Sequence, residues 1–365
     1  MRRLISAALV WMVAGAPLGV AASPASASEA PAAAPQWVFF RDRGVPDAVD
    51  SALVAVAHTI TPRARARREK AARERGGSIQ AVDARDLEPN AAYVAAVEAT
   101  GAHIRTASRW LNAVSVEADS EALAAIRAIP FVSEIRPVAI LEVEDETSAH
   151  AADEFWFGPA EHQLEMLGIP EAHAMGYHGE GVLICVLDSG FELEHEAFDQ
   201  LEVRATRDFL FHDENVAYDP HQDGINQSNH GTQVLSILAG FAPGHIVGPA
   251  YRADFILGKT EWLPSETKAE EDAWIEAIEW AEAMGADIVT SSLSYSKWYH
   301  PEDEDGRTAL ITQAANLASE RGVLVFNSIG NQGPGERTLS PPSDSPWVIA
   351  VGATDWNGRL TRFSS

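Results

Sequence analysis

The sequence has a single cysteine, Cys185, among 365 residues, so no disulfide can form within the chain. Basic residues are also scarce: 27 Lys and Arg stand against 53 Asp and Glu, which leaves a net charge of −26. This deficit argues against a nucleic-acid partner, because phosphate backbones are bound mainly by Lys and Arg. Beyond the N-terminus no run of about 18 apolar residues occurs, so we expect no membrane partner.

The N-terminus has the pattern of a secretory signal peptide, which we place at residues 1–27. Two arginines open the chain, an apolar run over residues 4–22 follows, and a small-residue cleavage pattern comes next. A membrane anchor is the alternative, but Pro17 interrupts the apolar run. Residues 28–35, rich in Ala, Pro and Ser or Glu, are predicted to be a linker. The sequence thus predicts a secreted, extracellular protein.

The charge is distributed unevenly along the chain. Residues 36–143 hold 14 basic and 14 acidic side chains, whereas residues 144–365 hold 11 basic and 38 acidic ones. Segments of such different character are expected to be separate domains. The boundary is placed in the acidic, irregular stretch 144–154, which is interpreted as a linker and maturation region.

Residues 36–143 are predicted to form a small ferredoxin-like α+β domain. The patterns run in the order strand, two helices, two strands, helix, strand. The helix over 62–76 is bounded by Thr61 and Pro62 at its start and by two glycines at its end. The strands are predicted at Trp37–Phe40, His103–Ser108, Trp110–Glu117 and Phe131–Val138, and the other helices at Tyr93–Thr100 and Ser120–Ala128.

Residues 155–365 are predicted to have an α/β fold with a doubly wound parallel sheet. Runs such as Val-Leu-Ile-Cys-Val-Leu at 182–187 have no polar face, as expected for strands covered by helices on both sides. The predicted strands are Val182–Asp188, Phe255–Gly258, Ile288–Ser292, Val323–Ile329 and Val348–Val351, with helices near His230–Phe241, Ala269–Met284 and Thr308–Arg321.

Polar residues with catalytic chemistry follow the ends of these strands, where reactive groups gather in a parallel sheet. Asp188 ends the first strand, and a carboxylate there can orient an imidazole. His230 opens a helix beside a glycine, a placement that suits a general base. Asn331 lies between glycines after a strand, where its amide could donate to an oxyanion. Taken singly, the three also fit a helix cap, a solvent-facing histidine and a turn asparagine.

A fourth segment, Ser-Ser-Leu-Ser at 291–294, leaves a strand with small polar residues. Such a strand end can pair its backbone with an extended peptide, although an ordinary core strand with a Ser-rich exit reads the same way. The four motifs occur in the order Asp-Ser-Gly, His-Gly-Thr, Ser-Leu-Ser and Gly-Asn-x-Gly. Over residues 155–365 this order resembles the subtilase family of serine proteases.

The resemblance implies a role for each motif. Asp188 would be the orienting acid, His230 the general base and Asn331 the oxyanion donor, while Ser292, Leu293 and Ser294 would form one wall of the substrate cleft. Ser294 departs from the family, which more often has Gly there. Residues 36–143 resemble the family's propeptide, which binds its own peptidase domain. A free-standing peptidase inhibitor of similar shape would have the same sequence pattern.

The family's nucleophile lies in a Gly-Thr-Ser motif, and none occurs in these 365 residues. The peptidase domain is therefore expected to be C-terminally incomplete, and the chain by itself to be inactive. Two rival interpretations are a non-catalytic protease-like decoy or inhibitor, and an α/β-hydrolase. The intact acid, base and oxyanion motifs argue against the decoy. A Gly-x-Ser-x-Gly elbow, which the hydrolase requires, is missing.

The sequence predicts no cofactor for catalysis, since the implied mechanism uses side chains alone. The sequence leaves open whether the protein binds a structural Ca²⁺. The insert between the Asp and His motifs contains His-Asp-Glu at 212–214 and Asp-Pro-His-Gln-Asp at 219–223. Oxygen ligands in a loop suit Ca²⁺ and subtilases often bind it structurally, but acidic loops in so acidic a chain are commonly just solvated.

Overall fold

The computed structural model describes residues 34–44, 49–76, 81–139, 157–263, 270–293, 295, 299–300, 302–335 and 338–365. The predicted signal peptide, the maturation region, Ser294 and residues 28–33 of the predicted linker lie outside these residues. No helix within the described part of the chain is long and apolar enough to cross a membrane. Cys185 is a free, buried thiol.

The N-terminal domain has a four-stranded antiparallel sheet in the order β2-β3-β1-β4. This is the strand order of a ferredoxin-like domain, and it confirms the predicted α+β class. The apolar side chains of Val38, Val114 and Val116 pack against Val97 and Ile126 of two helices. The elements are β1 (Gln36–Phe40), β2 (His103–Ser108), β3 (Ala113–Glu117), β4 (Val132–Pro137), α3 (Ala91–Glu98) and α4 (Ser120–Arg127).

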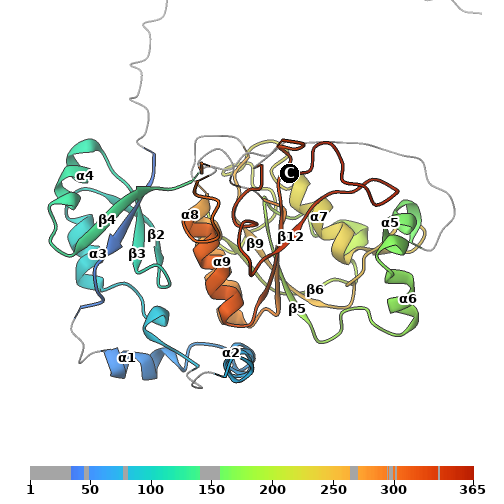
Figure 1. Cartoon of the computed structure of the whole chain (residues 1–365), viewed down its shortest axis with the longest axis horizontal. Helices are drawn as coiled ribbons and strands as arrows, with labels where there is room; N and C mark the ends of the chain where they lie inside the picture. The colour runs from blue at the N-terminus through green and yellow to red at the C-terminus, as the bar shows by residue number, and fades with distance from the viewer. Residues whose placement is uncertain are drawn as a thin grey trace, which may run out of the picture. The chain divides into compact units, whose positions relative to one another are not determined.

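Two further helices, α1 (Val49–Val56) and α2 (Pro62–Glu74), lie below this sheet in Figure 1. The start of α2 follows its sequence signal: Pro62 occupies the first turn, and the Thr61 side chain accepts a hydrogen bond from the Ala64 amide. α2 packs against α8 (Glu271–Met284) of the following domain. The sequence did not predict α1, whose mostly apolar run contains no strong start or stop signal.

The C-terminal domain is built on a six-stranded sheet in the order β12-β11-β10-β5-β9-β6. All five strand pairings are parallel, which confirms the predicted doubly wound α/β class. The strands are β5 (Leu183–Asp188), β6 (Glu202–Asp208), β9 (Asp254–Lys259), β10 (Ile288–Ser291), β11 (Leu324–Ser328) and β12 (Ile349–Val351). The edge strand β6 was not predicted, because charged side chains interrupt its sequence Glu-Val-Arg-Ala-Thr-Arg-Asp.

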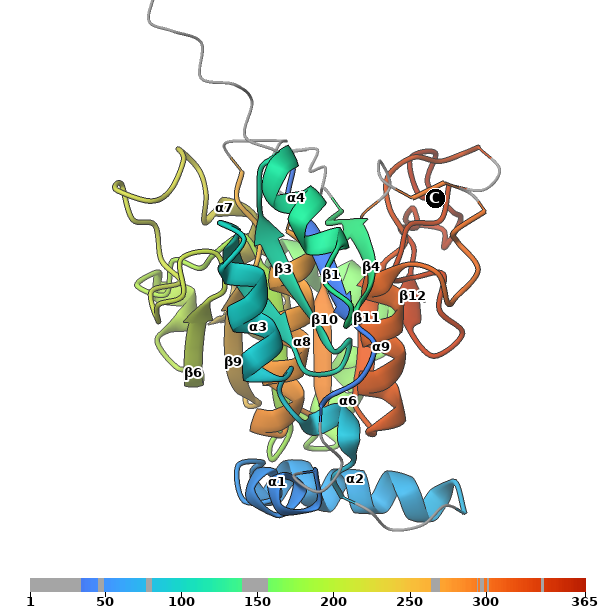
Figure 2. The same cartoon turned by 90° about the vertical axis from the view of Figure 1, so that its left-hand side faces the viewer.

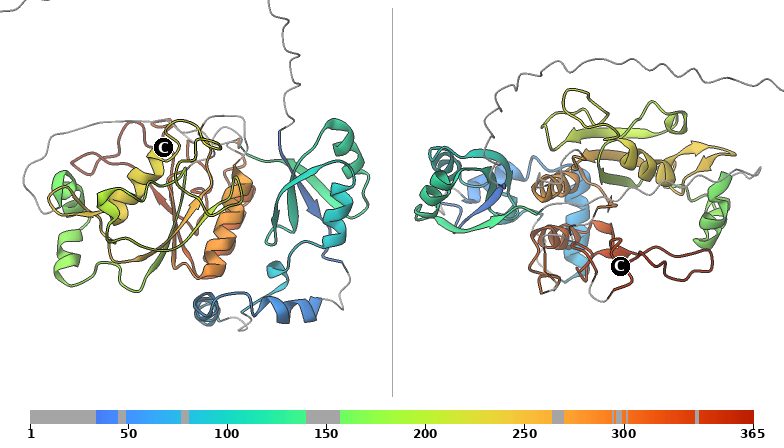
Figure 3. Two further views of the ribbon diagram at one scale, coloured as in Figure 1. Left: turned by 180° about the vertical axis from the view of Figure 1, so that it is seen from behind. Right: turned by 90° about the horizontal axis from the view of Figure 1, so that it is seen from above.

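Helices cover both faces of this sheet. Figure 1 and the view from above in Figure 3 show α8 and α9 (Leu310–Glu320) on one side and α7 (Asn229–Ala239) on the other. The side chains of β5 alternate accordingly: Cys185 and Leu187 pack in the core under α8 and α9, and Ile184 and Val186 pack in the core under α7. β5, buried at all six positions, is therefore central to the domain.

Two short helices and a hairpin complete the described C-terminal domain, and the sequence predicted none of them. They pack around a small separate core that includes Phe157, Leu164 and Val247. Their short lengths leave little hydrophobic periodicity to detect. They are α5 (Glu161–Met166), α6 (Ile169–Ala174) and the strands β7 (Phe241–Ala242) and β8 (Ile246–Val247).

Candidate active site

Asp188 lies at the carboxyl end of the central strand β5, and its side chain is fully buried. One of its oxygens, Oδ1, accepts three hydrogen bonds: from the Ser189 amide at 2.8 Å, from the Ser189 hydroxyl at 3.2 Å and from Nδ1 of His230 at 2.7 Å. A carboxylate can only accept hydrogen bonds. Nδ1 of His230 therefore carries the proton, and Nε2 is left as the basic nitrogen of the neutral ring.

The residues that follow His230 on the first turn of α7 hold its Nδ1 atom at 2.7 Å from Asp188 Oδ1. A side chain on Gly231 would collide with the backbone carbonyl of Gly190, so glycine permits the helix to approach the loop after β5. The Thr232 hydroxyl accepts from the Glu192 amide at 2.9 Å and thus fastens that loop to the helix. The His-Gly-Thr motif is explained by these contacts, with a quarter of the His230 side chain still exposed.

Asn331 follows β11 by three residues and is exposed. Its side-chain amide makes no hydrogen bond within the described residues, so it is available to a ligand. Because β5, β10 and β11 are neighbouring parallel strands, their carboxyl ends lie at one edge of the sheet. Asp188 and Asn331 therefore approach that edge from strands on either side of β10.

Two residues of the predicted cleft wall, Ser292 and Leu293, differ in their exposure. Ser292 is exposed at the end of β10, whereas Leu293 is buried in the core and its carbonyl accepts from the Asn327 amide at 2.9 Å. Ser294 lies outside the described residues. The side chain of Leu293 thus contributes to the core, and a cleft-lining role for Ser292 stays a prediction.

Sequence reasoning missed Glu261, which follows β9 beside Asp188. The Thr260 amide donates to the Asp188 carbonyl at 2.9 Å, which brings Glu261 to the same sheet edge. One ligand atom each from Asp188, His230 and Glu261 lie within 4.8 Å of one another. Within the described residues they are the only such group of His, Cys, Asp or Glu. Because Asp188 and His230 already bond each other, we do not assign them as metal ligands.

In the acidic insert, by contrast, carboxylates form ion pairs and hydrogen bonds with nearby groups of the protein. Asp223 pairs with the buried Lys259 ammonium at 2.6 Å, and Asp208 pairs with the same ammonium at 2.9 Å. Asp213 accepts from the Asn215 amide at 2.7 Å, and Asp219 accepts from the His221 amide. These bonds account for four carboxylates without an ion, and Ca²⁺ binding by the insert stays a prediction.

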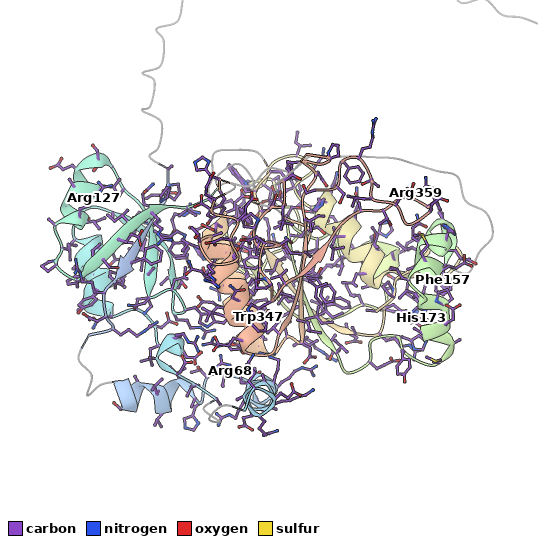
Figure 4. The ribbon with its side chains drawn as sticks, in the orientation of Figure 1. Arg68, Arg127, Phe157, His173, Trp347 and Arg359 are labelled. Carbon is purple, nitrogen blue, oxygen red and sulfur yellow. The ribbon has the colours of Figure 1, made fainter. Side chains whose placement is uncertain are left out.

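The N-terminal domain contacts a row of acidic side chains along α8. Burial raises the pKa of Glu279 to about 7. Burial also opposes ionisation of Glu282, but the guanidinium groups of Arg68 and Arg67 lower its pKa below the usual value; Arg68 is labelled in Figure 4. The contacts pair Asp272 with Arg105 and Ser115, Glu276 with Thr106, Glu279 with Ser108 and Arg109, and Glu282 with Arg67 and Arg68.

Comparison with known proteins identifies the family. The profile described as "Subtilase family" matches residues 179–365, just over half of the chain. Residues 35–152 match the one described as "Peptidase S8 propeptide domain, Bacteroidota". The chain belongs to the subtilase family of serine proteases and carries a propeptide domain of that family in front of the peptidase part.

Individual relatives agree with this assignment. Subtilisin E of Bacillus subtilis (strain 168) is 27% identical over 269 residues, which are 73% of this chain and 62% of the relative. The subtilisin of Bacillus pumilus is 30% identical over 206 residues, 55% of this chain and 67% of the relative. The chain thus spans about three-fifths of the length of Subtilisin E.

Among solved structures, fervidolysin from Fervidobacterium pennivorans resembles the chain with a TM-score of 0.56 and 18% identity. The match covers 76% of this chain and 44% of fervidolysin, which is described as a keratinolytic enzyme related to subtilisin. At this identity the likeness supports the fold alone.

Proposed function

We propose that this chain belongs to a secreted serine endopeptidase in which Asp188 orients the base, His230 is the general base and Asn331 is the oxyanion donor. The observation that carries the proposal is the 2.7 Å hydrogen bond from His230 Nδ1 to the buried Asp188 carboxylate at the end of β5. Membership of the subtilase family supports it. The substrates would be peptide bonds of proteins, and catalysis would need no cofactor.

In this mechanism Nε2 of His230 takes the proton of a serine hydroxyl as its oxygen attacks a peptide carbonyl. Asp188 keeps the ring in the required tautomer and stabilises the imidazolium. The amide of Asn331 donates to the oxyanion of the tetrahedral intermediate. The imidazolium then protonates the leaving amine, and water hydrolyses the acyl-enzyme in a second round. The nucleophile would be a serine outside these 365 residues, since no Gly-Thr-Ser occurs within them.

The N-terminal domain would act as the inhibitory propeptide and folding aid of the same protein. We propose residues 1–27 as the signal peptide, 36–143 as the propeptide domain, 144–154 as the region of maturation and 155–365 as the peptidase part. The charged contacts between the propeptide and α8 support this division, because they join two separately folded sheets.

A version extended through the serine tests the proposal. His230→Ala and Asp188→Asn should each nearly abolish peptide hydrolysis and should stall removal of residues 28 to about 145. His245→Ala is the matched control, because its exposed side chain lies away from these contacts and its loss should leave maturation intact. Self-maturation of His230→Ala without any other protease would contradict the proposal, and an inactive extended protein with an intact triad would favour the decoy.

A further inference from the structure

Two buried carboxyl groups beside His230 have oxygens without hydrogen-bond partners. The three hydrogen bonds to the Asp188 carboxylate all reach Oδ1, and Oδ2 has no partner within the described residues. Glu261 is 1% exposed, and neither of its side-chain oxygens has a partner there. A buried carboxylate left without donors is costly, so one of these groups is expected to be uncharged.

The surroundings of Glu261 indicate which group is neutral. The titratable groups facing it are Asp188 from β5, His230 from α7, Glu270 next to α8 and Tyr295 after β10. Burial, followed by the negative charges of Asp188 and Glu270, raises the pKa of Glu261 well above its usual value, and only His230 opposes this. Asp188 accepts three hydrogen bonds, whereas the side chain of Glu261 has no donor within the described residues.

The backbone around Glu261 is fastened in place. The side-chain amide of the fully buried Gln227 donates to the Ser189 carbonyl at 2.8 Å and to the Glu261 carbonyl at 2.5 Å. Its oxygen accepts from the Leu263 amide at 3.0 Å. Gln227 therefore joins the loop that follows Asp188 to the loop that carries Glu261, which keeps the two carboxyl groups close.

We propose that Glu261 is a positioning residue, protonated at neutral pH, which donates its O–H hydrogen bond to Oδ2 of Asp188 directly or through one water molecule. The two acids then carry a single negative charge, and Asp188 is fixed at both oxygens while it holds His230. The proton stays between the carboxyl groups and no bond to substrate is involved. The role given to Asp188 rests on the proposed function, but the protonation of Glu261 does not.

The first test observes Glu261 directly in the 365-residue chain. Carboxyl ¹³C signals of labelled glutamate are followed from about pH 4 to pH 9, and the Glu261 signal is identified by its loss in Glu261→Gln. We expect the neutral form at about pH 7. Glu282, whose guanidinium partners hold it ionised, is the matched control and is identified with Glu282→Gln. An ionised Glu261 at pH 7, or a Glu261 signal that changes when EDTA is added, would overturn the proposal.

A second measurement uses the pH profile of kcat/KM in the version extended through the serine. If Glu261 is neutral, Glu261→Gln removes no charge near His230, so the midpoint of the acid limb should move by only a few tenths of a pH unit. Glu261→Leu keeps the size but removes the hydrogen bond to Asp188, and should lower kcat about 10-fold or more with little change in KM. A downward shift of the acid limb by a unit or more in Glu261→Gln would show that Glu261 is ionised.

The two tests separate the possible failures. A neutral Glu261 signal together with self-maturation of His230→Ala would overturn the proposed function and leave the protonated pair in place. An ionised signal together with the expected loss of maturation in His230→Ala would overturn the inference about Glu261 alone. Should Glu261→Gln fail to fold, the loss of the signal in Glu261→Leu identifies Glu261 instead.

Discussion

At the scale of single residues, Gly231 allows the first turn of α7 to pack directly on the loop that follows Asp188. A Cβ atom at this position would overlap the Gly190 carbonyl and lie 3.0 Å from Asp188 Oδ1. The distance between His230 and Asp188 therefore depends on the absence of a side chain between them. This dependence explains why His230 is followed by glycine rather than by a better helix former.

We predict that Gly231→Ala destabilises the domain by about 1–3 kcal/mol, the usual cost of overpacking a tight contact. The added methyl group would meet the Gly190 carbonyl and the Asp188 side chain, and a shift of Asp188 would disturb its hydrogen bond to His230. Urea unfolding at neutral pH measures the change. Gln233→Ala, at an exposed position of the same helix, is the control and should change stability by less than about 0.5 kcal/mol.

The two asparagines near the end of β11 should behave differently. Asn331→Ala, in the version extended through the serine, should lower kcat by roughly 10²–10³-fold with little change in KM, because its amide would bind the oxyanion only as charge develops. Asn327→Ala should instead destabilise the fold, since its buried amide donates to the Leu293 carbonyl at 2.9 Å and the Ser328 carbonyl at 2.8 Å. A loss confined to KM in Asn331→Ala would contradict its role.

At the scale of elements, α8 serves two domains. One face buries Trp274, Ile275 and Ile278 in the core of the peptidase part, and acidic side chains at 272, 276, 279 and 282 face the propeptide. The spacings of four, three and three residues place these acids on one side of a helix. Figure 2 shows the propeptide sheet in front of α8.

The pKa of Glu279, raised by burial from its usual 4.5 to about 7, predicts how pH affects this interface. Because the pKa is raised in the folded state, the neutral Glu279 side chain contributes to the free energy of unfolding below about pH 4.5. This contribution is lost as pH rises through about 7. The shift corresponds to roughly 3 kcal/mol at about 1.4 kcal/mol per pH unit. Wild-type chain should therefore unfold at lower urea at pH 8 than at pH 5.

Glu279→Gln should remove about half of this difference, because the amide has no proton to lose, while buried Glu271, whose pKa is also raised to about 7, contributes with the same sign. Glu276→Gln, one turn earlier at the same interface, is the control and should keep it. A pH dependence that is the same in Glu279→Gln and in the wild type would show that another group is responsible. The opposite sign applies to Glu282, whose lowered pKa contributes stability that is lost only when pH falls below about 4.5.

At the scale of the whole molecule, apolar side chains are exposed at one edge of the central sheet. In the described sheet β12 pairs only with β11, and Trp347, Ile349, Val351 and Leu324 at this edge are 43–66% exposed; Trp347 is labelled in Figure 4. An open strand edge with apolar side chains favours association between chains. It also exposes the sheet to an apolar dye.

We predict that the 365-residue chain binds an apolar fluorescent dye and self-associates as its concentration rises. Ile349→Lys with Val351→Lys should reduce both effects several-fold, because charged side chains on an edge strand oppose pairing with another chain. Val54→Lys is the control, since Val54 is 64% exposed on α1, far along the chain from this edge. A monomer that binds no dye at any concentration would contradict the prediction.

Much of the fold and part of the candidate site could be predicted from local patterns. The apolar runs of β5 and β9 and the periodicity of α8 and α9 predicted a parallel sheet between helices, because such strands must be buried on both faces. Asp188 and His230 were candidates because a strand end and a helix start are local features. The chemistry of the Asp188–His230 pair follows from residue types alone.

Glu261 and the acidic row of α8 were decided by the tertiary structure. The sequence Lys-Thr-Glu at 259–261 does not indicate that Lys259 pairs with Asp208 and Asp223 in the interior. It also does not indicate that Glu261 is buried beside Asp188. That placement depends on the register of β9 against β5, which pairs Lys259 with Asp188 across 71 positions of sequence. The sequence by itself therefore determined the parallel sheet and the candidate pair Asp188 and His230, and only long-range strand pairing and domain packing decided which acids are buried together.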